Sequence, residues 1–175
     1  ESPRRPTKVI RVCIDDLAFF DGEAIVRPVN EDLGATTPLL RRLELAAGTE
    51  LHNQIRLQQP LPVGAAVVTS AGELSAELLV HAVVMSRLER VSTDTVRRAL
   101  MSALQRVESW QIKDVAIPPF GLGAGNLEID ESAKVMLGVI AQHLLGARYP
   151  ETITLVAETP EEERALSAAL ERSGL

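Results

Sequence analysis

The chain has 175 residues, 46% of them hydrophobic and 24% charged, which is an ordinary composition for one globular domain. Its net charge of −6 argues against a protein that binds nucleic acid through a broad basic face. The single cysteine, Cys13, excludes an internal disulfide framework and fits a reducing compartment, so we expect a cytoplasmic location.

The first eight residues are expected to form a flexible tail, followed by one domain over residues 9–175. The chain starts at Glu1 instead of Met, so we expect it to be processed or cut from a larger parent chain. No signal-peptide pattern opens it, and no apolar run reaches membrane-spanning length. We therefore expect no membrane partner.

Short strands and one helix are predicted in the first half. The strands are β-branched or apolar runs over residues 9–14, 23–26, 65–69 and 78–84. Thr37 and Pro38 have the pattern of an N-cap followed by the first helical residue. Leu40 and Leu43 follow at helical spacing, and Gly48 is the predicted stop.

Helices alternate with strands in the second half. From Thr93, apolar residues recur on one helical face: Val96, Ala99, Leu100, Ala103, Leu104 and Val107. A second helix is predicted through Val135, Met136, Val139, Ile140 and Leu144. Strands are predicted at 115–117 and 153–157, and Thr159 and Gly174 bound a last helix. The alternation predicts an α/β fold, a three-layer α/β/α sandwich around a mixed, largely parallel sheet.

The glycine loop, "FGLGAGN" (residues 120–126), lies between a predicted strand and a predicted helix. Ligands of parallel sheets bind where such strand-to-helix loops gather. Glycines allow successive backbone amides to approach a phosphate closely, at the positive end of the following helix. Alternatively, they only supply positive φ to a tight turn. Taken alone, the motif leaves both interpretations open.

Three segments, taken in order, resemble the macro domain family. "EAIVRPVNEDLG" (23–34) is similar to its strand-and-loop signature, and "VGAAVVTSAGELSAELLVHAVV" (63–84) to its next hairpin. "DVAIPPFGLGAGNLEIDESAKVML" (114–137) resembles its second ligand loop and the helix after it. The resemblance extends over about residues 9–170. Because the family binds ADP-ribose and its relatives, the resemblance implies that this chain binds ADP-ribose or a related diphosphate nucleotide.

The resemblance also implies roles for individual residues. Asp16 lies where the family's acidic residue accepts the adenine amino group, and Leu17 beside it offers a backbone amide. Asn30 corresponds to the asparagine near the distal ribose. For Asp16 and Asn30 the alternative role is to stabilise a turn. The phosphates are expected between two loops, formed by Thr36 and Thr37 and by Gly121, Leu122, Gly123, Ala124, Gly125 and Asn126. Phe120 is the aromatic residue nearest to a ligand loop and the candidate for stacking.

The chain also departs from the family pattern. Residues 36–38, Thr-Thr-Pro, stand where the family usually has glycines, and proline has no amide to donate. Leu40 occupies the position at which hydrolytic members often carry an aspartate, with Glu44 one helical turn beyond it. Arg27 replaces the first asparagine of the signature. We therefore expect a divergent member that binds nucleotide. The alternatives are an ADP-ribosyl hydrolase and a macro-like module that has lost its ligand and serves in assembly or protein interaction.

Metal and cofactor chemistry find no support in the sequence. His52, His81 and His143 are widely spaced, and no second cysteine completes a zinc set. His81 lies within a predicted strand and is expected to be packed in the core. We predict no cofactor, no metal and no catalytic residue.

Overall fold

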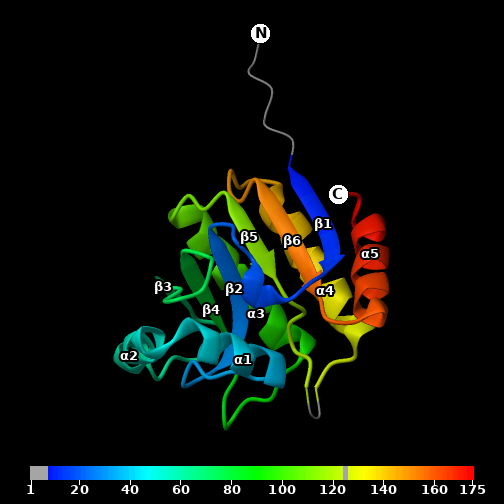
Figure 1. The fold of residues 1–175 in the computed structure, drawn as a ribbon. Coiled ribbons are helices and arrows are strands. Elements are labelled where there is room, and N and C mark those ends of the chain that lie inside the picture. The colour runs from blue at the N-terminus through cyan, green and yellow to red at the C-terminus, as the bar shows by residue number, and fades with distance from the viewer. Residues whose placement is uncertain (1–7, 124–125) are drawn as a thin grey trace.

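The computed structural model describes residues 8–123 and 126–175 and contains a six-stranded sheet of order β1-β6-β5-β2-β4-β3 (Figure 1). The strands are β1 (Val9–Ile14), β2 (Ala24–Asn30), β3 (Ala66–Ser70), β4 (Leu78–Met85), β5 (Asp114–Ile117) and β6 (Thr152–Ala157). Neighbouring strands are parallel except for the antiparallel pair β3–β4. The predicted mixed, largely parallel sheet is confirmed. The predicted tail, apart from Lys8, lies outside the described residues.

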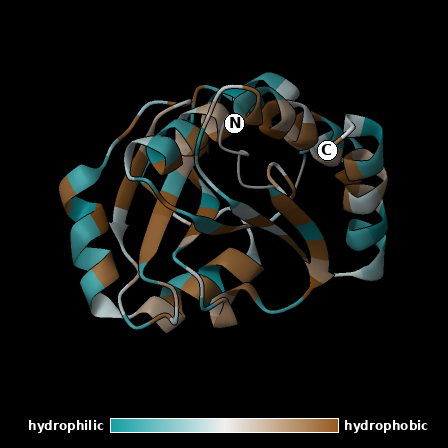
Figure 2. Ribbon diagram, turned by 90° about the horizontal axis from the view of Figure 1, so that it is seen from above, coloured by the Kyte–Doolittle hydropathy of each residue, from teal (hydrophilic) through white to brown (hydrophobic). Residues whose placement is uncertain are grey.

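Helices cover both faces of the sheet (Figures 1 and 2). One face carries α3 (Thr93–Ser109), α4 (Ile129–Leu144) and α5 (Pro160–Ser173), whose apolar residues form one core cluster with the sheet. The other face carries η1 (Leu17–Phe19), α1 (Pro38–Ala47) and α2 (Thr49–Gln58), with a second cluster. The three-layer α/β/α arrangement is confirmed. Among the described helices, none combines the length and apolar character that crossing a membrane requires.

The central strand β2 contributes to both clusters by alternation. Ala24 and Val26 pack in the cluster below α3, whereas Ile25 and Val29 pack in the cluster below α1. Successive side chains of a strand point to opposite faces, so Arg27 belongs to the α1 face. A charged residue is thereby placed inside an apolar layer.

Strand β2 is longer than predicted, because the charged Arg27 and the proline Pro28 interrupt the apolar pattern that indicates a strand. Proline is rare in central strands, since it cannot donate to the ladder. Here β5 pairs only with Ala24 and Ile25, so at Pro28 the strand has β4 as its one neighbour. The strand therefore continues to Asn30 without β5 beside it, and Val29 forms an isolated antiparallel bridge with Ala35.

The helix α2 was not predicted. Gly48 does end α1, with φ of 87°, but it also precedes the first residue of α2 directly. In α2 only Leu51 and Ile55 are buried, so its apolar face is too narrow to give a helical pattern. Packing in the fold, more than local sequence, stabilises this helix.

Candidate functional site

The carboxyl ends of β1, β2, β5 and β6 meet at one edge of the sheet, because these strands are parallel. Four connections begin there: η1 after β1, the first loop (residues 30–37) after β2, the glycine loop after β5, and the start of α5 after β6. In Figure 1 this edge points downward, with α1 in front of it. Sheets of this kind bind ligands at such an edge.

Two glycines of the glycine loop have backbone conformations that disfavour other residues. Gly121 has φ of 83° and Gly123 has φ of 125°. A Cβ on Gly121 would come within 2.9 Å of the Val96 side chain, so its glycine is required by packing. A Cβ on Gly123 would lie 3.3 Å from the carbonyl oxygen of Thr36. The bare backbone at Gly123 therefore lets the glycine loop approach the first loop.

Some amides of the glycine loop are used within it and others are not. Leu127 donates to the Gly121 carbonyl at 3.0 Å, and Asn126 donates to the Gly123 carbonyl at 3.3 Å. The amides of Leu122 and Gly123 have no acceptor in the described part of the chain. Ala124 and Gly125 lie outside the described residues. The turn role is thus observed, and none of the described residues occupies the amides of Leu122 and Gly123.

Thr36 and Thr37 line a cavity of about 440 Å³ at the start of α1, together with Arg41 and Arg42. The hydroxyl of Thr37 accepts from the Leu40 amide at 3.3 Å, which confirms the predicted N-cap. The partial positive charge of a helix N-terminus therefore lies beside two arginines. This corner of the molecule favours an anion, although the whole chain is acidic.

Asp16 and Leu17 line a second cavity, of about 330 Å³, which Arg42 also borders. The carboxylate of Asp16 is exposed, and its Oδ1 accepts from the Ala18 amide at 3.0 Å, so it does cap η1. The Leu17 side chain is buried beneath it. Arg42 also forms an ion pair with Glu158 at 3.4 Å, which links α1 to the residue after β6.

Asn30 organises the first loop. Its Oδ1 accepts from the amides of Asp32 and Gly34, both at 2.9 Å, and its backbone amide donates to the Gly34 carbonyl at 3.0 Å. The turn role is therefore observed. The Nδ2 group, in contrast, has no acceptor among the residues that the structure describes, so it can still donate to a ligand.

Phe120 does not have the environment predicted for it. Its ring is completely buried in the core between the sheet and α4, and the structure exposes no face of it for stacking. Its backbone is also engaged: the amide donates to Met136 Sδ, and the carbonyl accepts from Ser132. The expectation of stacking was wrong because closeness to the loop in sequence does not determine side-chain direction.

A buried polar network under the first loop was not predicted. Arg27, fully buried, donates from Nε to His81 Nδ1 at 3.0 Å, from Nη1 to Glu44 Oε1 at 2.6 Å, and from Nη2 to the Leu33 carbonyl at 2.9 Å. His81 is also fully buried, as expected, and its Nε2 lies 2.8 Å from Thr69 Oγ1. Nδ1 accepts from Arg27, so Nε2 carries the proton and the imidazole is neutral.

The electrostatics of this network follow from burial. Burial lowers the pKa of Arg27, and the Glu44 carboxylate opposes that shift. Burial, followed by the charge of Arg27, lowers the pKa of His81 well below its ordinary value. A charged residue in the run "AIVRPV" is a sequence signal of such a network, but its partners become evident only in the fold.

Glu44 is engaged by Arg27 instead of facing the glycine loop. It lies two turns into α1, and its carboxylate is the counter-ion of the buried guanidinium. Leu40, at the position where hydrolytic macro domains often have an aspartate, is buried. Before α1, the described residues next to Gly123 are Thr36 and Thr37, which carry hydroxyls and not carboxylates.

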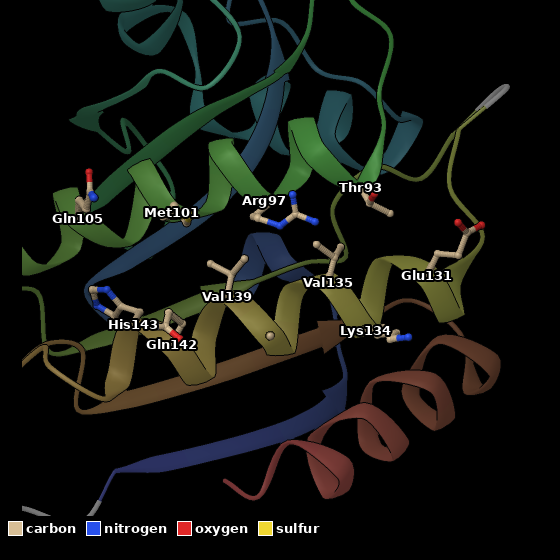
Figure 3. A pocket seen from close by; sticks show the side chains of 11 residues that line it. Thr93, Arg97, Met101, Gln105, Glu131, Lys134, Val135, Val139, Gln142 and His143 are labelled. Carbon is tan, nitrogen blue, oxygen red and sulfur yellow. The ribbon is translucent and has the colours of Figure 1, made fainter.

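A larger groove, of about 720 Å³, lies between α3 and α4 (Figure 3). Figure 3 shows Val135 and Val139 of α4 pointing toward α3. Two polar groups there have partners within the protein, because Arg97 pairs with Asp94 and His143 contacts the Tyr149 carbonyl. The loops that follow β1, β2, β5 and β6 converge at the strand ends and not at this groove, so the strand ends are the candidate site.

The strand order and the helices on both faces define the class of α/β/α proteins with a mixed, largely parallel sheet. The Macro domain family profile matches residues 26–136, which is more than half of the chain. The chain belongs to the macro domain family.

The chain is also similar to other proteins in sequence and in fold. An uncharacterized protein of Aeropyrum pernix is 31% identical, with 91% of this chain and 84% of the relative covered. A mutant macrodomain of Oceanobacillus iheyensis, solved with ADPR, has a TM-score of 0.84 at 18% identity, covering 97% and 96% of the two chains. The macrodomain of the same organism with ADP has a TM-score of 0.79 at 19% identity, covering 92% and 89%.

Some relatives are much longer than this chain. An uncharacterized protein of Mycobacterium tuberculosis is 26% identical over 89% of this chain, which spans only 43% of that relative. In such proteins the region matched by this chain is therefore one part of a larger polypeptide.

Proposed function

We propose that this macro domain binds ADP-ribose or a related diphosphate nucleotide at the carboxyl edge of its sheet. The main support is the close approach of the glycine loop to the first loop, with Gly123 next to Thr36 and two loop amides without a partner among the described residues. Solved neighbours of the same fold contain ADPR and ADP.

The ligand would extend along the edge from Asp16 to the glycine loop. Asp16 would accept from the adenine amino group, and Asn30 would donate its Nδ2 protons to a ribose hydroxyl. The diphosphate would lie between Thr36 at the N-terminus of α1 and the amides of Leu122 and Gly123, where the helix and backbone amides favour negative charge. The charge of Arg41 adds to this preference, whereas Arg42 is paired with Glu158.

The first experiment is calorimetric titration of the chain with ADP-ribose, ADP and NAD. We expect ADP-ribose to bind, and we expect Gly123→Val to abolish binding while the protein stays folded. Valine at φ of 125° is strained, and its Cβ would press on the Thr36 carbonyl at the point where the phosphates would pass.

Gly146→Val is the matched control. Gly146 follows α4, and a Cβ there would meet nothing within 4 Å, so this variant should bind like the native chain. If all three nucleotides fail to bind to the folded native chain, the proposal is wrong, and the alternative of a module that serves in assembly or protein interaction is the next to test. Undiminished binding by Gly123→Val would move the site away from the glycine loop.

A further inference from the structure

We infer that Arg27 is a positioning residue that fixes the first loop and the start of α1 in the geometry needed for nucleotide binding. The inference rests on the proposed function, because it concerns the shape of that site. Arg27 itself is completely buried and contributes through Leu33 and Glu44, not through contact with the ligand.

The guanidinium of Arg27 joins three parts of the molecule. Nε bonds to His81 on the neighbouring strand β4, with which Arg27 is paired in register. Nη1 bonds to Glu44 on α1, and Nη2 bonds to the Leu33 carbonyl in the first loop. A planar group with five donors in a fixed geometry can serve three acceptors in three directions at once.

The contact with Leu33 supports an unusual backbone conformation. Leu33 has φ of 60°, a left-handed value that residues with a Cβ adopt rarely. Its side chain is fully buried, and its amide donates to the Asn30 carbonyl at 2.9 Å. The Leu33 carbonyl accepts from Arg27. Such conformations persist only where the surroundings determine them.

The contacts of Arg27 with Leu33 and Glu44 lie before and after the segment that would touch the phosphates. Leu33 lies before Thr36 and Thr37, and Glu44 lies after them on α1, so Arg27 anchors the segment on both sides. The Thr36 carbonyl is the atom closest to the would-be Cβ of Gly123. A shift of this segment would therefore change the distance between the first loop and the glycine loop.

The ion pair between Arg27 and Glu44 is sensitive to substitution of either residue. The guanidinium is fully buried, whereas the Glu44 side chain is 27% exposed. A buried charge that loses its partner is strongly destabilising. Lysine at position 27 would keep the charge for Glu44, but a compact ammonium lacks the fork that reaches Leu33 and His81 as well.

The test is Arg27→Lys, examined by hydrogen–deuterium exchange and by titration with ADP-ribose. We expect exchange to accelerate in residues 31–44, while β1 and β6 stay as protected as in the native chain. We expect ADP-ribose affinity to fall by roughly 3- to 30-fold, the range that packed side chains commonly transmit. A purely structural role predicts faster exchange throughout the fold and unchanged affinity of the folded fraction.

Arg106→Lys is the matched control, because Arg106 also donates from Nε to a carbonyl, that of Ala66, but on the α3 face. It should leave exchange in residues 31–44 and ADP-ribose affinity unchanged. Native exchange in this segment of Arg27→Lys, or native affinity in a chain that binds ADP-ribose, would overturn the inference.

Two further outcomes also decide the question. If the native chain binds no ADP-ribose, the proposed function fails, and the exchange pattern alone decides whether Arg27 positions the loop. If Arg27→Lys does not fold, Glu44→Gln replaces it, because glutamine keeps an acceptor but removes the counter-charge. Faster exchange confined to residues 31–44 in Glu44→Gln supports the inference, and native exchange there contradicts it.

Discussion

The carboxylate of Asp16 has two oxygens, and the fold uses one of them. Oδ1 accepts from the Ala18 amide at 3.0 Å, whereas Oδ2 has no partner among the described residues. The side chain is exposed beside a cavity of about 330 Å³. A free carboxylate oxygen there suits the amino group of adenine. Capping and base recognition, which the sequence leaves as alternatives, are therefore compatible in one side chain.

Asp16→Asn should separate these two roles. Asparagine is as good a cap as aspartate, so we expect η1 to stay intact. Its amide would present a donor to the adenine amino group, and ADP-ribose binding should weaken by about 1.5–3 kcal/mol, the typical contribution of a hydrogen bond to a charged group. Calorimetric titration of the native and variant chains measures the difference.

The hypoxanthine analogue of ADP-ribose is the control ligand. It has a carbonyl where adenine has the amino group, so the amide of the variant can donate to it. We expect Asp16→Asn to bind this analogue at least as well as the native chain does. Equal losses for the two ligands would show that Asp16 acts only on the fold.

At the level of secondary structure, α1 and α5 begin with the same two residues. Thr37-Pro38 starts α1 and Thr159-Pro160 starts α5, and each threonine hydroxyl accepts from an amide three residues on. The two helices therefore have equivalent caps. They differ in the charge around them, because Thr37 lines a cavity with Arg41 and Arg42, whereas the first turn of α5 carries Glu161, Glu162 and Glu163, which disfavour an anion.

Thr37→Ala and Thr159→Ala should accordingly have similar effects on stability and different effects on binding. Each should lower the free energy of unfolding by about 1 kcal/mol, because one cap is lost. Only Thr37→Ala should weaken ADP-ribose binding, since it disturbs the helix N-terminus beside the anion. Urea unfolding and calorimetric titration measure the two quantities. Equal binding losses in both variants would place the phosphates elsewhere.

The comparison of caps shows which elements the sequence predicts well. Thr37, Thr159 and Gly174 mark helix ends through contacts within a few residues, and all three ends are confirmed. The helix α2 and the second half of β2 were not predicted, because their stability depends on packing and on strand pairing. Local patterns cannot show that β5 leaves β2 after Ile25.

In the candidate site, too, features set by local sequence were predicted and features set by packing were not. The glycine loop was predicted from its spacing and from its resemblance to a family motif. The pair Arg27–Glu44 was not, because these residues are separated by 17 positions and meet only after β2 and α1 have packed together. Phe120 was misjudged, since its direction depends on how the chain leaves β5.

At the scale of the whole molecule, the buried polar network joins three strands of the sheet to a helix that covers one of its faces. It extends from Thr69 on β3 through His81 on β4 and Arg27 on β2 to Glu44 on α1. Each member donates to or accepts from the next, so the network fixes the relative positions of three strands and one helix. In the folded chain the imidazole at its centre is therefore neutral.

The neutral imidazole predicts a pH dependence of stability. The pKa of His81 lies well below its ordinary value in the folded chain because of burial and the charge of Arg27. Above pH ~6.5 the imidazole is neutral in both states. Below it the unfolded chain takes up a proton that the folded chain does not, so the free energy of unfolding should fall by about 1.4 kcal/mol per pH unit.

Urea unfolding at pH 7.5 and pH 5.5 tests this, with His81→Gln as the comparison. Glutamine can accept from Arg27 and donate to Thr69, but it does not titrate. The variant should therefore be less stable at pH 7.5 yet lose much less than the native chain on acidification. Asp114 and Glu162, whose pKa values are raised by burial, act in the opposite direction, adding stability as pH falls. Equal losses in both proteins would show that groups other than His81 carry the pH dependence.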